Sequence, residues 1–242
     1  MDRNVYLRMS EQDAKHWWFV ARRRILGDQI TALQLAPGAR VLEAGAGPGG
    51  NLEMLSQFGA LDAFEVDEDA RQIASARSGL EIRPGALPGD IDYEPGSFDL
   101  IVAFDVIEHI EADRESVQAL AQLLRPGARL IITVPAYKWL WSVHDERHHH
   151  KRRYTRPEVR RLAEEAGLWV EKCSHFNTIL LPLVVVTRFL KKLAGVAKSP
   201  DDDMPSPLVN AVLLRIFSFE RYLLRHLSLP FGVSILCIAR RR

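Results

Sequence analysis

The chain has 242 residues, of which 47% are hydrophobic and 26% charged. These values are ordinary for a globular protein and exclude an intrinsically disordered, collagen-like or coiled-coil chain. The net charge of +1 conceals an asymmetry, because residues 41–115 hold 17 acidic and 4 basic side chains whereas residues 116–242 hold 10 acidic and 21 basic ones. The acidic part favours a cationic or hydroxyl-rich ligand and the basic part an anionic one, although solubilising faces produce similar patterns.

The number of cysteines and the hydropathy of the chain indicate its cellular compartment. The two cysteines, Cys173 and Cys237, are too few for a disulfide framework, and the first residues lack the apolar core of a secretory signal. The longest apolar run, residues 179–186, is far shorter than the ~20 residues that span a bilayer. The sequence therefore predicts a cytoplasmic chain with no transmembrane helix.

The predicted elements begin with a helix over residues 13–33 that carries an aromatic and arginine-rich stretch. Strands and helices then alternate along the chain. Strands are expected at residues 40–44, 61–66, 80–83, 98–104, 129–134, 168–174 and 232–239. Helices are expected at residues 51–59, 69–78, 116–124, 157–166 and 208–227, the last preceded by an apolar segment from Pro182 and a Pro-rich acidic linker at 199–205.

This alternation predicts an α/β fold, doubly wound, with a mostly parallel Rossmann-like sheet and helices on both faces. Ligands of such sheets bind at the carboxyl ends of the strands, near the switch point. Three parts are expected: an N-terminal helical lid over residues 1–38, a core over 39–175 and 232–242, and a helical insertion over 176–231 before the last strand.

The most informative motif is a strand that ends in an acid and enters a glycine-rich turn. Glu43 is followed by Gly45, Gly47 and Gly49, and glycines allow tight turns and close approach of a ligand to the backbone. Gly45, Gly47 and Gly50 also satisfy the G-x-G-x-x-G pattern of dinucleotide sites. A pyrophosphate disfavours a neighbouring carboxylate, so Glu43 favours a ligand with an ammonium group instead.

Acidic side chains also end the second predicted strand. Asp67 stands where an acid accepts hydrogen bonds from a ribose diol, and Glu65 points to the same side of the strand. This position indicates a nucleoside without deciding which one, and a solvated carboxylate at a strand end remains the alternative.

Four stretches now give a resemblance to class I S-adenosylmethionine-dependent methyltransferases. They cover roughly residues 40–136 in the order that is typical of the family, with Ala128 departing from a common second glycine. The stretches are Glu43-x-Gly45-x-Gly47-x-Gly49, Glu65-Val66-Asp67, Gly96 to Val102 leading into Asp105-Val106-Ile107-Glu108-His109, and Leu124-Arg125-Pro126-Gly127.

The resemblance implies a cofactor, S-adenosylmethionine, and a set of residues that hold it. The glycine loop would lie against the methionyl and ribose parts, with Glu43 near the amino group and Asp67 on the ribose hydroxyls. It also implies that the last of seven strands is antiparallel. The remaining cofactor contacts implied are Ala86 and Leu87 at the adenine and Phe104 and Asp105 beside the sulfonium. Separately, Arg22 on the N-terminal helical lid is a candidate partner for the cofactor carboxylate.

A hydroxyl acceptor needs its proton removed near the transition state, and His109 is the candidate base because it follows the fourth strand closely. A structural role at a helix start is the alternative.

The segment after the fifth strand is predicted to bind the acceptor. Basic side chains there are suited to a phosphate or carboxylate, and aromatic ones to a ring or lipid. Convergence of His144, Asp145 and His148 on a metal ion is an alternative, but a metal site is not predicted, because adjacent histidines such as those at 148–150 cannot all face one ion on a regular element. The candidate residues are Trp141, His144, Arg152, Arg153 and Tyr154.

Together these features predict methyl transfer to a small-molecule acceptor, on oxygen, with a sugar- or lipid-linked anionic substrate. Basic residues beside apolar faces in 176–231 permit peripheral contact with an anionic membrane surface. A nucleic-acid or protein methyltransferase is an alternative, although no Asn/Asp-Pro-Pro-Tyr motif is present. The other two alternatives are a noncatalytic cofactor-binding module and a dehydrogenase. The acceptor and the oligomeric state stay open.

Overall fold

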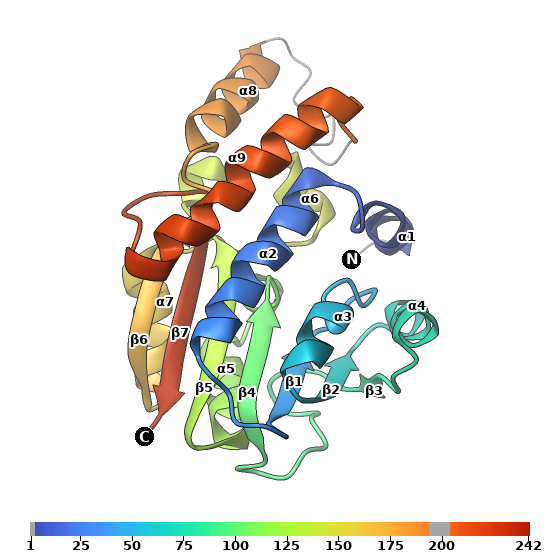
Figure 1. Ribbon diagram of the computed structural model, residues 1–242, viewed down its shortest axis with the longest axis vertical. Helices are drawn as coiled ribbons and strands as arrows, with labels where there is room; N and C mark the ends of the chain where they lie inside the picture. The colour runs from blue at the N-terminus through green and yellow to red at the C-terminus, as the bar shows by residue number, and fades with distance from the viewer. Residues whose placement is uncertain (1–2, 194–203) are drawn as a thin grey trace.

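A computed structural model describes residues 3–193 and 204–242 of the chain and has one central sheet (Figure 1). The sheet has seven strands in the order β3-β2-β1-β4-β5-β7-β6. Only β7 runs antiparallel to its neighbours β5 and β6. The strands are β1 Arg40–Ala44, β2 Ala60–Glu65, β3 Arg83–Pro84, β4 Phe98–Phe104, β5 Leu124–Pro135, β6 Leu168–Phe176 and β7 Ser234–Arg241. The predicted fold class is confirmed.

Helices cover both faces of the sheet, as Figure 1 shows. Alternating side chains of β4 supply the two cores: Ile101 packs with the α5 and α7 side, and Leu100 and Val102 pack with the α2 and α9 side. The helices are α1 Arg3–Gln12, α2 Trp17–Ala32, α3 Leu52–Leu55, α4 Glu68–Ser78, α5 Asp113–Leu123, α6 Val143–Arg147, α7 Arg156–Glu165, α8 Leu181–Leu193 and α9 Pro207–His226.

Several element bounds differ from the sequence prediction. The helix expected over 13–33 begins later, as α2 at Trp17 with His16 as its N-cap, and α1 at Arg3–Gln12 was not predicted. The strand expected over 80–83 is limited to Arg83–Pro84, whereas β5 is longer than expected. The helix expected over 51–59 shortens to α3 and a 3-10 turn. Tertiary contacts decide such bounds more than local propensity does.

The segment between β6 and β7 carries α8 and α9, and α9 packs along α2. Asn210 on α9 joins the two helices, because its Oδ1 accepts from the backbone of Trp17 and its Nδ2 donates to the carbonyl of Lys15. Most of the predicted Pro-rich linker, residues 199–203, lies outside the described residues, as do residues 1–2 of the predicted lid.

Two smaller expectations concern the cysteines and the membrane. Cys173 and Cys237 are register partners on β6 and β7, and both are buried free thiols, so no disulfide joins them. Among residues 3–193 and 204–242, every helix is too short or too polar to cross a bilayer.

Candidate functional site

The site lies at the carboxyl ends of β1 and β4, where the sheet order changes direction. Connections from β1 run one way to β2 and β3, and those from β4 run the other way, which opens a crevice between them. A cavity of about 970 Å³ occupies this crevice. Its walls come from the glycine loop after β1, from α2, from the turn after β4, from the segment around α6, and from α8.

The glycine loop forms the floor of the cavity. Gly45 has φ +70°, and a Cβ there would come within 2.8 Å of Val106. Gly47 has φ +52°, and a Cβ there would meet no atom within 4 Å. Gly45 is therefore required for packing, whereas Gly47 leaves space for a ligand on the cavity wall. Gly49, with φ +82°, packs against α4 instead of lining the cavity.

Glu43 lies under the glycine loop and is fully buried. Its Oε1 accepts from Asn51 Nδ2 at 2.8 Å, and its Oε2 is without a hydrogen-bond partner in the described part of the chain. Burial raises the pKa of Glu43 to about 8. Asn51, and not Glu43 itself, lines the cavity. The acid is thus placed to act on a ligand through Asn51.

Glu65 is the carboxylate at the cavity wall after β2. It accepts from Gly47 N at 2.8 Å and from Asp67 N at 3.0 Å, so it joins the glycine loop to the turn that follows β2. Asp67 caps α4 by accepting from Ala70 N at 2.9 Å, and it lies outside the cavity lining. Of these two acids, Glu65 therefore lines the cavity and Asp67 does not.

The residues predicted at the adenine lie on another part of the cavity wall. Ala86 and Leu87 line the cavity, together with Phe64 at the end of β2. These apolar side chains form a surface suited to a flat ring.

The turn after β4 is tied to α2 by a buried ion pair. Arg22 Nη2 donates to Asp105 Oδ2 at 2.5 Å and to Thr133 Oγ1 at 3.2 Å. The guanidinium also lies over the rings of Trp18 and Phe104. Arg22 lines the cavity, but its charge is already paired, which the sequence did not indicate.

Glu108 and His109 follow in a 3-10 turn and face the cavity. Glu108 is fully buried, and neither of its carboxyl oxygens has a hydrogen-bond partner among the residues described. Burial and the nearby Asp105 raise the pKa of Glu108 well above its usual value. Burial, His150 and His148 lower the pKa of His109 to about 3, so its imidazole is neutral at pH 7 but accepts a proton weakly.

The predicted acceptor segment divides into two parts. His144 and Arg153 line the cavity. Arg152 pairs with Asp113 at 2.9 Å, and the Tyr154 hydroxyl donates to the same carboxylate at 2.9 Å. Both lie outside the large cavity and line a smaller hollow between α5 and α7. Trp141 is partly exposed and is also absent from the cavity wall.

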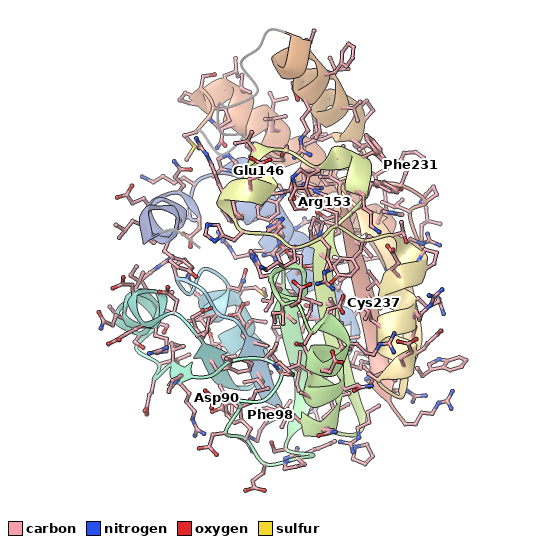
Figure 2. All side chains as sticks on the ribbon, turned by 180° about the vertical axis from the view of Figure 1, so that it is seen from behind. Asp90, Phe98, Glu146, Arg153, Phe231 and Cys237 are labelled. Atoms are coloured by element: carbon pink, nitrogen blue, oxygen red, sulfur yellow. The ribbon has the colours of Figure 1, made fainter. Side chains whose placement is uncertain are left out.

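Arg153 has a structural partner of its own. It holds the buried Asp145 through Nε at 2.7 Å and Nη2 at 3.0 Å. Figure 2 labels Arg153 near Glu146, beyond the ends of the parallel strands. The guanidinium therefore fixes the α6 segment, so its charge is largely neutralised before any ligand binds.

The sequence prediction missed Glu108, His148 and His150, which all line the cavity. The signal for Glu108 was its place between apolar residues, three positions after Asp105. For the histidines, their number in a short segment was a signal, but their convergence depends on the turn that the chain makes there.

The parallel sheet with an antiparallel last strand, the glycine loop at its switch point and the acids beside that loop define a class I S-adenosylmethionine-dependent methyltransferase. The family model described as "Methyltransferase domain" matches residues 17–172. The chain belongs to this family.

Curated relatives match part of the chain. A ubiquinone biosynthesis O-methyltransferase of Xanthomonas euvesicatoria is 32% identical over 109 residues, which is 43% of this chain and 45% of the relative. A protein of the same name from Caulobacter is 32% identical over 101 residues, 39% of this chain and 40% of the relative. The chain spans about half the length, or less, of these relatives.

Solved structures share the fold. A chain of the complex between the Haloferax volcanii Trm112 methyltransferase activator and its methyltransferase has a TM-score of 0.65 at 17% identity, covering 98% of this chain and 94% of that one. Haemonchus contortus phosphoethanolamine N-methyltransferase 2, in complex with S-adenosyl-L-methionine, has a TM-score of 0.55 at 16% identity, covering 88% of this chain and 52% of that one. At such identities the likeness concerns the fold alone.

Proposed function

We propose that the chain transfers a methyl group from S-adenosylmethionine to a hydroxyl oxygen of a small, lipid-linked acceptor that carries an anionic group. One observation carries this proposal: a single cavity of about 970 Å³ runs from the glycine loop to the apolar residues Leu180, Leu183 and Val184. Since a pocket for one small ligand occupies roughly 300–1,000 Å³, this volume has room for a cofactor and part of an acceptor.

The residues around the glycine loop fit the cofactor. Gly47 leaves open space at the wall, and a buried oxygen of Glu43 is unpartnered behind Asn51, where an ammonium group would be stabilised. Glu65 would accept from ribose hydroxyls, with Asp67 behind it. When bound, the cofactor supplies an electrophilic methyl group on a positively charged sulfur. The chain's task is then to position the two reactants and exclude water.

Further contacts complete the cofactor half of this proposal. Ala86 and Leu87 would hold the adenine, and Phe104 would lie beside the sulfonium. Asp105, oriented by its ion pair with Arg22, would form the cavity wall beside the sulfonium as well. Because Arg22 is paired with Asp105, it would act on the cofactor by positioning the Asp105 carboxylate.

The acceptor half combines apolar and charged walls. Leu180, Leu183 and Val184 would contact a lipid chain or ring, and Arg147 lies on the same cavity wall, whereas Arg153 there is already paired with Asp145. Positive side chains at the rim of an apolar cavity favour an acceptor with one anionic end. The O-methyltransferase names of the curated relatives support oxygen as the methylated atom.

His109 is the wall residue proposed to receive the acceptor's proton, and because its pKa is lowered it suits an acidic hydroxyl. Glu108, whose pKa is raised, lies beside it. Both follow β4, directly beyond Phe104 and Asp105, so an acceptor hydroxyl at the cofactor's reactive end would lie near them.

Exposed apolar side chains on α8 support delivery of the acceptor from a membrane surface. Val186, Phe189 and Leu190 are each more than half exposed, while Leu183 on the same helix lines the cavity. On α9, Leu208 is 77% exposed and Arg215 is exposed nearby. An apolar helix face with basic neighbours binds anionic lipid surfaces. The acceptor's apolar part would then pass along α8 into the cavity.

The test is to incubate the protein with methyl-labelled cofactor and a cell lysate, and to separate lipid-extractable compounds, water-soluble compounds, nucleic acid and protein before mass spectrometry. The proposal expects label in a lipid-extractable small molecule and not with the Gly47→Ala variant. Label confined to nucleic acid or protein would support the alternative acceptors, and cofactor binding without any labelled product would favour a noncatalytic module.

Membrane delivery has its own test, sedimentation with phosphatidylglycerol or phosphatidylcholine vesicles. The wild type is expected to sediment with the anionic vesicles, and the Phe189→Ser/Leu190→Ser variant to stay in the supernatant. Trp169→Ser, which changes an equally exposed aromatic residue on β6, is the matched control. Equal sedimentation of all three proteins would contradict the role of α8.

A further inference from the structure

Three histidines of the α6 segment converge on one point. His144 lies on α6, His148 follows the helix, and His150 is two residues further on. Each offers a ring nitrogen, and the three nitrogens lie within 4.8 Å of one another. His149, between the last two, has φ +56°, so the chain turns there and carries His149 out of the group. The sequence argument against a metal assumed a regular element, and this turn removes that assumption.

A buried carboxylate orients one of these imidazoles. Asp145 Oδ1 lies 2.8 Å from His150 Nδ1, and the same carboxylate is held by both Nε and Nη2 of Arg153. Asp145 also accepts from Ser142 N at 2.8 Å. A carboxylate at Nδ1 leaves Nε2 of the ring for another partner, which is the usual arrangement behind a metal-binding histidine.

A second group of potential ligands shares His150. Ligand atoms of Glu108, His109 and His150 also lie within 4.8 Å of one another. Glu108 is fully buried, and within the described residues both of its oxygens lack a hydrogen-bond partner. A buried carboxyl in that state has no structural explanation of its own, because buried polar groups normally find partners. A cation beside it would supply one.

From this arrangement we infer that His144, His148 and His150 bind one divalent transition-metal ion of the zinc type at the acceptor end of the cavity. Glu108 lies beside the ion and balances its charge. Three imidazoles suit zinc, cobalt or nickel, whereas magnesium prefers oxygen ligands. Nitrogens around one tetrahedral ion with bonds of about 2.0–2.1 Å are about 3.4 Å apart, so the rings need to move by little more than 1 Å.

The role of this ion rests on the proposed function. All three histidines line the cavity that holds the glycine loop. A site with three protein ligands keeps a position open for water or substrate. The open position would take an oxygen of the acceptor, which identifies the acceptor as a compound with an ionisable hydroxyl group able to bind a metal.

Metal binding itself is measured without cofactor or acceptor. Tag-free protein is stripped with a chelator and titrated with Zn²⁺ by calorimetry, and separately with Co²⁺ by visible absorption. One ion per chain is expected, with the intense cobalt bands of a four-coordinate site, and a large excess of Mg²⁺ is expected not to displace it. Absence of stoichiometric Zn²⁺ binding, or a cobalt spectrum like that of the hydrated ion, would overturn the inference.

Variants assign the ligands. His148→Ala and His144→Ala are each expected to weaken Zn²⁺ binding by at least 10-fold and to change the cobalt spectrum. His149→Asn is the matched control, because asparagine tolerates positive φ and residue 149 is outside the group. Equal affinity of His148→Ala and His149→Asn would overturn the assignment. Circular dichroism and thermal unfolding of each variant identify any that lose binding by misfolding. If a variant misfolds, the cobalt spectrum of the wild type still tests whether a four-coordinate site exists.

Failure of this inference is separable from failure of the proposed function. Binding of S-adenosylhomocysteine, followed by thermal shift, is measured on the same metal-free proteins. Cofactor binding with no metal binding removes the metal site and leaves the methyltransferase proposal intact. Metal binding with no cofactor binding supports the site while contradicting the proposed function.

Discussion

The guanidinium of Arg22 on α2 and the carboxylate of Asp105 after β4 form an ion pair, with Nη2 2.5 Å from Oδ2. Asp105 has φ +57°, and its other oxygen lies 3.3 Å from the Thr133 hydroxyl on β5. The pair therefore joins α2 to the turn after β4 and to β5 at the cavity wall. Because the Arg22 side chain is almost fully buried, the pair matters more than a surface ion pair does.

Removing one member of this pair is expected to destabilise the fold. Arg22→Met leaves the Asp105 carboxylate without its charged partner, which costs about 2–4 kcal/mol in free energy of unfolding. Arg22→Met/Asp105→Asn is expected to recover part of that loss, since no charge is then left unpaired. Urea unfolding of the four proteins gives the coupling energy. Additive effects would show that the two side chains act separately.

Gly47→Ala separates cofactor binding from backbone strain. A Cβ at residue 47 meets no protein atom within 4 Å, and the same holds at Gly38. Both glycines have positive φ, so alanine at either costs about 1–2 kcal/mol in stability. Only residue 47 lines the cavity, so only Gly47→Ala is expected to weaken S-adenosylhomocysteine binding, by 10-fold or more in calorimetry. Equal affinity of the two variants would contradict binding of the cofactor against Gly47.

Glu43→Gln tests the buried acid through the pH dependence of stability. The folded pKa is about 8, against 4.5 for an ordinary glutamate, so the folded protein keeps a proton that the unfolded chain has lost. The contribution of Glu43 to the free energy of unfolding is therefore fully present below pH 4.5. It falls by about 1.4 kcal/mol per pH unit as pH rises toward 8.

Urea unfolding of the cofactor-free protein at pH 5, 6.5 and 8 measures that slope. Glu43→Gln is expected to gain stability relative to the wild type as pH rises over this range. Glu53→Gln, at an exposed carboxylate on α3, provides the comparison. A constant difference between Glu43→Gln and the wild type would show that Glu43 is ionised in the folded state.

The fold could be predicted because the residue patterns that specify its strands and helices are local in the sequence. In β4, alternate residues face opposite cores, and the strand-helix rhythm implies parallel pairing. The antiparallel direction of β7 came from the family resemblance, since no local pattern encodes it. The start of α2 at Trp17 instead of Asp13 was missed, and Asp13 lies in the preceding turn, where it pairs with Arg77 on α4, 64 residues away.

The site was predictable where it is built from one contiguous motif. The glycine loop and Glu43 lie together in the sequence and in the structure. The roles of Glu65 and Asp67 depend on a hydrogen bond from Gly47, and Arg152 is engaged by Asp113, 39 residues before it. Such partners are set by the tertiary fold, so residue type and spacing alone did not reveal them.

The ion pair between Asp13 and Arg77 is expected to hold the N-terminal segment against α4 at the cavity mouth. Arg77 binds both carboxylate oxygens of Asp13, at 2.8 and 3.0 Å, and Asp13 is almost fully buried. Asp13→Asn and Arg77→Met are each expected to lower stability by about 1–3 kcal/mol, with a coupling energy in a double-mutant cycle, because they share one interaction.

Both variants are also expected to speed tryptic cleavage after Lys15 and release of S-adenosylhomocysteine, since Asp13 lines the cavity. Arg160→Met, which removes an exposed i,i+4 pair with Glu164 on α7, is the matched control and is expected to change neither rate. Limited proteolysis and stopped-flow dissociation give the two rates. Cleavage and release at wild-type rates in Asp13→Asn would mean that the N-terminal segment stays closed without the pair and that other contacts, such as those of α2 with α9, retain it.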